Sequence, residues 1–247
     1  MNKIIFLGCL SSSKYKDTCE NATKIITFLD PEYQVLENPP CCGALAHQIA
    51  PNDEIIAHIK FVNDWFKDNN VSELITICAG CYSYFTRYYP KYLGTDFNVK
   101  VMHLLQLMNK SESLNRLNLK YPGKKLKIFY HDACHLRNAE IPIIDEPRNI
   151  INSIEGNIVL GEMENNRINS LCCGAGGGVY SIFKENSDFS SKLIFDQMRM
   201  SKALLTACPF CYTSFIRIKE ENNIKTPVIK FEDFILKLME GVDPISV

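Results

Sequence analysis

The sequence predicts an α/β fold made of two pseudo-symmetric halves, each with its own parallel sheet. Five cysteines recur in the same order about 130 residues apart, which indicates a duplicated domain. Short apolar runs of strand length alternate with longer stretches of helical period. Strands that are separated by helices pair in parallel, so we expect each half to be Rossmann-like.

The first half is expected to begin with a strand at residues 4–7, which runs directly into Cys9. A helix is expected after the cap candidate Asp53. Its core face would carry Ile55, Ile56, Ile59, Val62 and Phe66. A strand at residues 73–77 runs into Cys78, and a strand at 99–101 precedes a helix around 104–108.

The second half is expected to repeat this order. Strands are expected at residues 126–130, 203–206 and 228–230. The helices that follow them would bury Leu193, Ile194, Met198, Phe234, Ile235, Leu238 and Met239. Residues 114–121 are expected to form a polar connector, so that residues 1–115 form the first domain and residues 116–247 the second.

Ten of the eleven cysteines form two sets, each with a lone cysteine, an adjacent pair and a CxxC pair. The first set is Cys9, Cys41, Cys42, Cys78 and Cys81, and the second is Cys134, Cys172, Cys173, Cys208 and Cys211. Only Cys19 lies outside the pattern. In open parallel sheets, ligands bind beyond the carboxyl ends of the strands. Because the cysteines lie where strands end, each set is expected to converge at one edge of its half.

The number and type of these ligands point to iron-sulfur clusters. A closed zinc site takes four ligands, whereas each set offers five, and adjacent cysteines can address two iron atoms of one cluster. Soft thiolates also favour iron-sulfur over harder ions. The glycines at 174 and 176–178 follow the second adjacent pair and let the chain approach a bulky ligand. A zinc-stabilised scaffold is the competing interpretation.

The composition argues against several classes of partner. Lys and Arg number 27 against 28 Asp and Glu, and no block of like charges points to nucleic acid or an anionic membrane. No apolar run has the length of a membrane span, and the N-terminal run is too short for a signal peptide. We therefore expect a cytoplasmic protein whose cysteines bind metal or do redox chemistry rather than form structural disulfides.

The pattern Cys-x31-Cys-Cys-Gly with Cys-Ala-Gly-Cys-Tyr, repeated as Cys-x37-Cys-Cys-Gly-Ala-Gly-Gly-Gly with Cys-Pro-Phe-Cys, resembles the duplicated CCG domain of the heterodisulfide reductase B subunit. The resemblance covers nearly the whole chain. It implies that each set holds a noncubane [4Fe-4S] cluster and that the heterodisulfide of coenzyme M and coenzyme B, a substrate of methanogenesis, is split between them. Iron-sulfur subunits of lactate or glycolate oxidation share CCG motifs, so an electron-transfer subunit of a 2-hydroxyacid oxidising complex is the alternative.

The resemblance also implies partners, and the residues around Cys134 offer candidate catalytic groups. The chain lacks the cysteine run of ferredoxin-type clusters, so electrons are expected from a ferredoxin-like iron-sulfur subunit and, upstream of it, a flavoprotein subunit. His131 and His135 flank Cys134 and are candidate proton donors to a product thiolate. Alternatively they order the loop, with Asp132 capping or turning the backbone.

Overall fold

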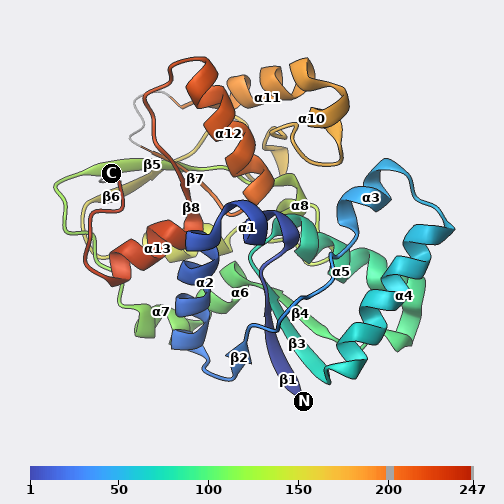
Figure 1. Ribbon diagram of the computed structural model, residues 1–247. Helices are drawn as coiled ribbons and strands as arrows, with labels where there is room; N and C mark the ends of the chain where they lie inside the picture. Colours follow the sequence, from blue (N-terminus) through green and yellow to red (C-terminus); the bar gives the residue numbers. More distant parts are fainter. Residues whose placement is uncertain (199–202, 246–247) are drawn as a thin grey trace.

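The computed structural model describes residues 1–198 and 203–245, and within them the chain forms two parallel sheets of four strands each (Figure 1). The first sheet has the order β2-β1-β3-β4, with β1 at Asn2–Phe6, β2 at Tyr33–Gln34, β3 at Val71–Thr76 and β4 at Lys100–His103. The second has the order β6-β5-β7-β8, with β5 at Leu126–Tyr130, β6 at Ile158–Gly161, β7 at Ala203–Thr206 and β8 at Val228–Lys230. The predicted α/β fold with two similar halves is confirmed.

Helices connect the parallel strands of the first half. They are α1 Cys9–Lys14, α2 Lys16–Leu29, α3 Ala44–Ile49, α4 Asp53–Asp68, α5 Ala79–Leu93, the 3-10 turn η1 Gly94–Asp96, α6 Leu104–Met108 and α7 Ser111–Leu117. The helix predicted after Asp53 is α4, but its cap is Asn52, whose side chain accepts the Ile55 N–H at 3.0 Å. Asn52 has the extended backbone of a cap, whereas Asp53 is already helical and adds negative charge to the first turn.

The second half has the corresponding helices in the same order. They are α8 Cys134–Arg137, α9 Glu146–Asn152, the 3-10 turn η2 Arg167–Asn169, α10 Val179–Ile182, α11 Lys184–Asp196, α12 Pro209–Glu221 and α13 Phe231–Met239. Ile194, Phe234 and Ile235 are buried as predicted. Leu193 is 37% exposed, because the neighbouring Ile194 takes the core-facing position of α11.

The segment between the halves differs from its prediction. Residues 111–117 form α7, and Leu117, Leu119 and Tyr121 are buried in the core. The expectation of a polar connector at 114–121 is therefore wrong, because these apolar side chains anchor the segment. The boundary placed between residues 115 and 116 falls inside α7 and stays a prediction.

The two halves pack through a pseudo-twofold pair of helix contacts. Helix α2 of the first half lies beside α13 of the second (Figure 1). Helix α9 of the second half contacts α6 of the first. One hydrophobic cluster continues through both halves and includes Ile25 and Phe234. The Tyr82 hydroxyl also donates to the Ile141 carbonyl at 2.9 Å. The halves therefore share a core.

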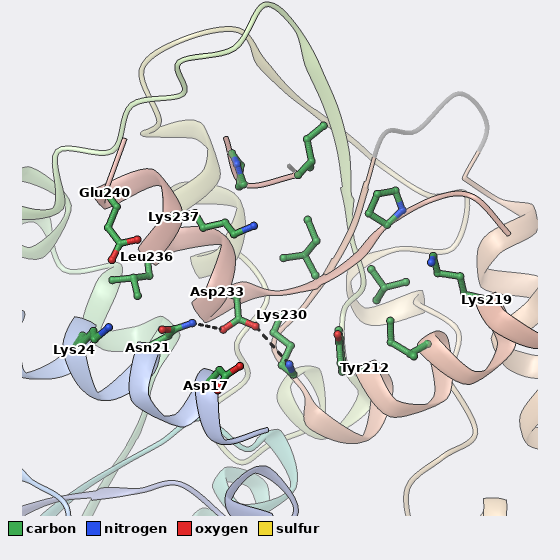
Figure 2. A pocket seen from close by; sticks show the side chains of 16 residues that line it. Asp17, Asn21, Lys24, Tyr212, Lys219, Lys230, Asp233, Leu236, Lys237 and Glu240 are labelled. Atoms are coloured by element: carbon green, nitrogen blue, oxygen red, sulfur yellow. Dashed lines mark hydrogen bonds and ion pairs between the residues drawn. The ribbon is translucent and has the colours of Figure 1, made fainter. Parts of the chain in front are cut away.

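Polar contacts reinforce the junction between α2 and α13. The Asp233 carboxylate accepts hydrogen bonds from Asn21 at 2.9 Å and from Thr18 at 3.0 Å. Figure 2 shows Asp233 between Asn21 and Lys230 in the wall of a cavity of about 550 Å³ that α2, α12 and α13 line. Asp233 of the second half thus fixes the position of α2 in the first half.

Candidate functional site

The first cysteine set comes together beyond the carboxyl ends of β1 and β3. Cys9 begins α1 directly after β1, and Cys78 is the residue that precedes α5 after β3. The sulfur atoms of Cys9 and Cys41 are 3.7 Å apart, and those of Cys42 and Cys81 are 3.3 Å apart. The lone cysteine, the adjacent pair and the CxxC pair thus meet in space, although long segments separate them in the sequence.

The second set repeats this arrangement after β5 and β7. Cys134 begins α8, and its sulfur lies 3.7 Å from that of Cys172. Cys173 interacts with Cys211, which also interacts with Cys208. Cys172 is exposed, while Cys173, Cys208 and Cys211 are buried. Each set therefore has a buried base and an edge that reaches the surface.

The first cysteine of the adjacent pair has a lowered pKa in both sets. Contacts with Cys42 and Cys9 hold the pKa of Cys41 far below its ordinary value, and the Gly43 N–H, 3.5 Å from its sulfur, has the same effect. Contacts with Cys134 and Cys173 lower the pKa of Cys172 in the same way, and so does the Gly174 N–H, 3.4 Å from its sulfur. In each set the first cysteine of the adjacent pair is therefore favoured as the thiolate, which is the protonation state that metal ligation requires. In the first set, contact with Cys81 lowers the pKa of Cys78 as well.

Two glycines shape the backbone after the adjacent pairs. Gly43 and Gly174 have φ values of +86° and +71°, a region that L side chains rarely adopt. This conformation turns each glycine N–H back toward the sulfur two residues earlier, in Cys41 and Cys172. Five thiols with an inward N–H donor fit an iron-sulfur cluster, whose sulfur atoms accept such hydrogen bonds.

The two histidines near Cys134 occupy different environments. The His135 ring is partly exposed, with Nδ1 3.9 Å from the Cys134 sulfur and Nε2 2.9 Å from the Gln48 amide of the first half. His131 is 0% exposed, and its burial lowers its pKa to about 4. At neutral pH His131 is therefore uncharged, and a role as proton donor stays a prediction for both residues.

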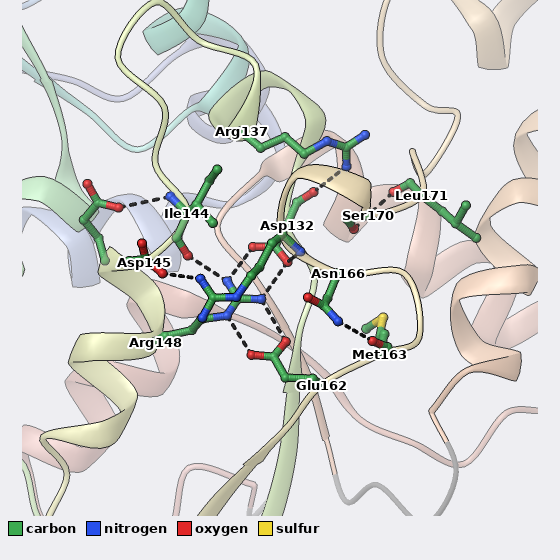
Figure 3. Close-up of polar contacts among 12 residues, drawn as sticks. Asp132, Arg137, Ile144, Asp145, Arg148, Glu162, Met163, Asn166, Ser170 and Leu171 are labelled. Carbon is green, nitrogen blue, oxygen red and sulfur yellow. Dashed lines mark hydrogen bonds and ion pairs between the residues drawn. The ribbon is translucent and has the colours of Figure 1, made fainter.

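An ion-pair network with a buried centre surrounds Asp132, two residues before Cys134 (Figure 3). Arg148 donates to both oxygens of Asp132 at 2.7 and 2.9 Å, and to both oxygens of Glu162 at 2.7 and 2.9 Å. The Arg167 N–H donates to Asp132 as well, at 2.7 Å. Asp132 therefore joins the loop before Cys134 to α9 and η2, and through Arg148 to Glu162 after β6, in addition to the capping or turning role considered for it. The sequence holds no local signal for this pairing.

A cavity of about 320 Å³ is lined by residues of both halves. Its lining residues include close sequence neighbours of cysteines from both halves: Leu10, Leu45, Ala175, Gly178 and Phe210. Two cations, Lys14 and Arg217, also line it. The combination of apolar walls and two cations suits a small anionic molecule with an apolar middle. Sequence reasoning did not find this cavity, because neither cation lies in a motif.

Cys19 stays outside both sets and is buried in the hydrophobic core. Among the described residues, no group of three or more His, Cys, Asp or Glu side chains is arranged to hold a single metal ion. In the same part of the chain, no helix has the length and apolarity that crossing a membrane requires.

The fold and its two sites define a duplicated α/β protein with a five-cysteine cluster at the strand ends of each half. The sequence model of the CCG cysteine-rich domain family matches residues 4–86 and 128–216, and the chain belongs to this family. A solved aspartate racemase from Picrophilus torridus aligns over 96% of the chain and 93% of its own, but at a TM-score of 0.35 and 12% identity it supports no inference.

Curated relatives are iron-sulfur proteins and subunits of oxidoreductases. An uncharacterized iron-sulfur protein of Methanocaldococcus jannaschii is 32% identical over 89% of this chain and 42% of its own length. The B subunit of the fumarate reductase (CoM/CoB) of Methanothermobacter marburgensis is 30% identical over 83% of the chain and 40% of its own. The D subunit of the dihydromethanophenazine:CoB–CoM heterodisulfide reductase of Methanosarcina acetivorans is 25% identical, over 85% and 52%. The chain thus spans about half or less of these relatives, and it is related to iron-sulfur subunits of oxidoreductases.

Proposed function

We propose that this chain is the subunit of a redox complex that reduces a small disulfide of the CoM-S-S-CoB type to two thiols. The observation that carries this proposal is one cavity lined by residues of both halves, several of which are close sequence neighbours of cysteines in the two complete five-cysteine sets. The relative named as a heterodisulfide reductase subunit supports it. The reaction consumes two electrons and two protons for each disulfide bond that is broken.

The residues that would hold the cofactors are the ten cysteines of the two sets, with one noncubane [4Fe-4S] cluster in each. Such clusters supply electrons at potentials set by ligands, hydrogen bonds and solvent exposure. The exposed Cys9, Cys41 and Cys172 bring each set close to the surface, where electrons from a partner can enter. In this proposal the partner is a ferredoxin-like iron-sulfur subunit fed by a flavoprotein subunit, in the cytoplasm.

The cavity residues would bind and orient the substrate. Lys14 and Arg217 would pair with anionic groups, while Leu10, Leu45 and Phe210 would contact its hydrocarbon part. Arg217 is held in place by an ion pair with Asp188 and by the Tyr180 ring, 4.3 Å from its guanidinium carbon. Such a restrained guanidinium can bind a carboxylate or phosphate with little loss of side-chain entropy.

The proposal is tested on protein purified without oxygen. We expect about eight irons and eight acid-labile sulfides per chain, from two four-iron clusters. Arg217→Met should raise KM for an anionic disulfide about tenfold or more, as expected when one charge-assisted hydrogen bond is lost. Stoichiometric zinc without sulfide would instead support the zinc-stabilised scaffold and contradict the proposal.

A second candidate is an electron-transfer subunit that touches no substrate, as in lactate or glycolate oxidation. A relative named as an EtfAB:quinone oxidoreductase of Syntrophomonas wolfei, 26% identical over 85% of this chain and 30% of its own length, favours it, because that name includes no disulfide. In this case Arg217→Met would leave cluster reduction by a lactate-oxidising partner unchanged. Addition of coenzyme M or coenzyme B would also leave the electron paramagnetic resonance signals unchanged.

A further inference from the structure

The two halves place different side chains at one equivalent position. Phe6 and His131 each stand three residues before the lone cysteine of their set. Phe6 pairs with Thr76, two residues before the first CxxC pair. His131 follows Tyr130 at the end of β5, and its N–H donates to the Leu205 carbonyl of β7 at 2.9 Å. Strand position and sequence spacing therefore both make His131 the counterpart of Phe6.

The packing of the two rings is also equivalent. Phe6 meets Phe85 edge to face, with ring centroids 5.1 Å apart and planes at 89°. His131 meets Phe215 with centroids 5.0 Å apart and planes at 89°. Phe85 and Phe215 each follow the last cysteine of their set by four residues. The second half thus keeps the shape of this contact but replaces a hydrocarbon ring by an imidazole.

This replacement leaves polar atoms buried without a partner. His131 is 0% exposed, and neither Nδ1 nor Nε2 has a hydrogen-bond partner among the described residues. A neutral imidazole carries one N–H donor and one acceptor, and buried groups of this kind are almost always hydrogen-bonded. Phenylalanine fills the same place in the first half at no such cost. His131 lies three residues before Cys134, and Cys172 is among the charges that act on its ring, so the ring is near the second cysteine set.

We propose that His131 donates a ring N–H hydrogen bond to the iron-sulfur cluster of the second set, and that this bond gives the two clusters different reduction potentials. The inference rests on the proposed cluster binding. A donor directed at a cluster stabilises the negative charge that reduction adds, and so raises the potential. Phe6 can offer no such bond to the first cluster. Electrons that enter the chain therefore settle first on the second cluster, and His131 acts as a positioning and tuning residue.

The test is a redox titration, followed by electron paramagnetic resonance, of protein loaded without oxygen. His131→Phe copies the first half, and His131→Gln keeps an N–H donor. Phe6→Leu is the matched control, because it changes packing at the equivalent position without removing a polar group. We expect full iron and sulfide in His131→Phe, with the potential of one cluster lowered and the other unchanged. The potential should stay near the wild-type value in His131→Gln, and both should stay unchanged in Phe6→Leu.

Loaded His131→Phe protein with both potentials unchanged would overturn the inference. So would an equal downward shift of the first cluster in Phe6→Leu, since packing alone would then account for the effect. Loss of the second cluster from both His131 variants would also overturn it, because the ring would then serve assembly rather than tuning. Absence of iron and sulfide from the wild-type protein is distinguishable from all of these, because it would overturn the proposed function itself.

Discussion

The Arg148 guanidinium binds both carboxylate oxygens of Asp132, at 2.7 and 2.9 Å, in a site where neither side chain is more than 4% exposed. Asp132 lies two residues before Cys134, so this pair fixes the loop from which the second set begins. Removing one partner of a buried ion pair leaves the other charge without compensation, which usually costs about 3–5 kcal/mol.

We therefore expect Arg148→Met to lower the free energy of unfolding by about 3–5 kcal/mol, measured by urea unfolding of the loaded protein. Arg167→Met is the control, because its ion pair with Asp145 is largely exposed and should contribute about 1 kcal/mol or less. Similar losses of unfolding free energy in the two variants would show that burial does not make the Arg148–Asp132 pair more important than the exposed one.

Cys42 and Cys173 are equivalent members of the two sets. If each set holds its own cluster, Cys42→Ala and Cys173→Ala should each remove about half of the iron and sulfide. Each variant should also lose a different electron paramagnetic resonance signal. Cys19→Ala tests specificity, since Cys19 is equally a buried cysteine but belongs to neither set. Iron loss from Cys19→Ala equal to that of the other two would refute the assignment of ligands.

Gly174 is constrained by more than its backbone angle. A Cβ added there would lie 2.8 Å from the Cα of Ser187, whereas one added at Gly94, which also has positive φ, would meet nothing within 4 Å. Both alanine variants incur about 1–2 kcal/mol of backbone strain. Only Gly174→Ala should in addition displace the Cys172 loop and release iron, which metal analysis of the two purified variants would reveal.

His103 makes stability depend on pH. Burial lowers its pKa to about 3, whereas the unfolded chain accepts the proton near pH 6.5. Below pH 6.5 the unfolded state therefore binds more protons, and His103 reduces the free energy of unfolding by about 1.4 kcal/mol for each pH unit lost.

His103→Asn should remove this slope while keeping the helix cap, because asparagine can replace Nδ1 as the acceptor of the Leu105 N–H. Unfolding free energies of the variant and the wild type, compared between pH 7 and pH 5, measure the difference. Parallel curves would show that His103 does not titrate as its burial requires.

The sequence was sufficient for the fold class, since buried strands such as residues 126–130 are predominantly apolar runs that are followed within a few residues by cysteines. The short edge strands β2 and β6 were not predicted, because Tyr33 and Gln34 pair with β1 over too few residues to leave a pattern. The repeated order and spacing of the cysteines also predict both candidate sites.

The rest of the site depends on contacts between distant residues. Asp132 and Arg148 are 16 residues apart, and Lys14 and Arg217 come from opposite halves, so no local period links either pair. The unpaired ring of His131 is likewise visible only after burial and hydrogen bonds are known. Sequence patterns record local periodicity, whereas these features arise from tertiary packing.

The reciprocal packing of α2 on α13 and of α9 on α6 is the geometry of an isologous interface, in which each partner contributes the same surface. In a homodimer of one such half, any substitution would occur twice, at both ends of the symmetry axis. Covalent fusion of the copies removes that constraint, so one copy can change while the other does not. Phe6 and His131 are a position where the copies have already diverged.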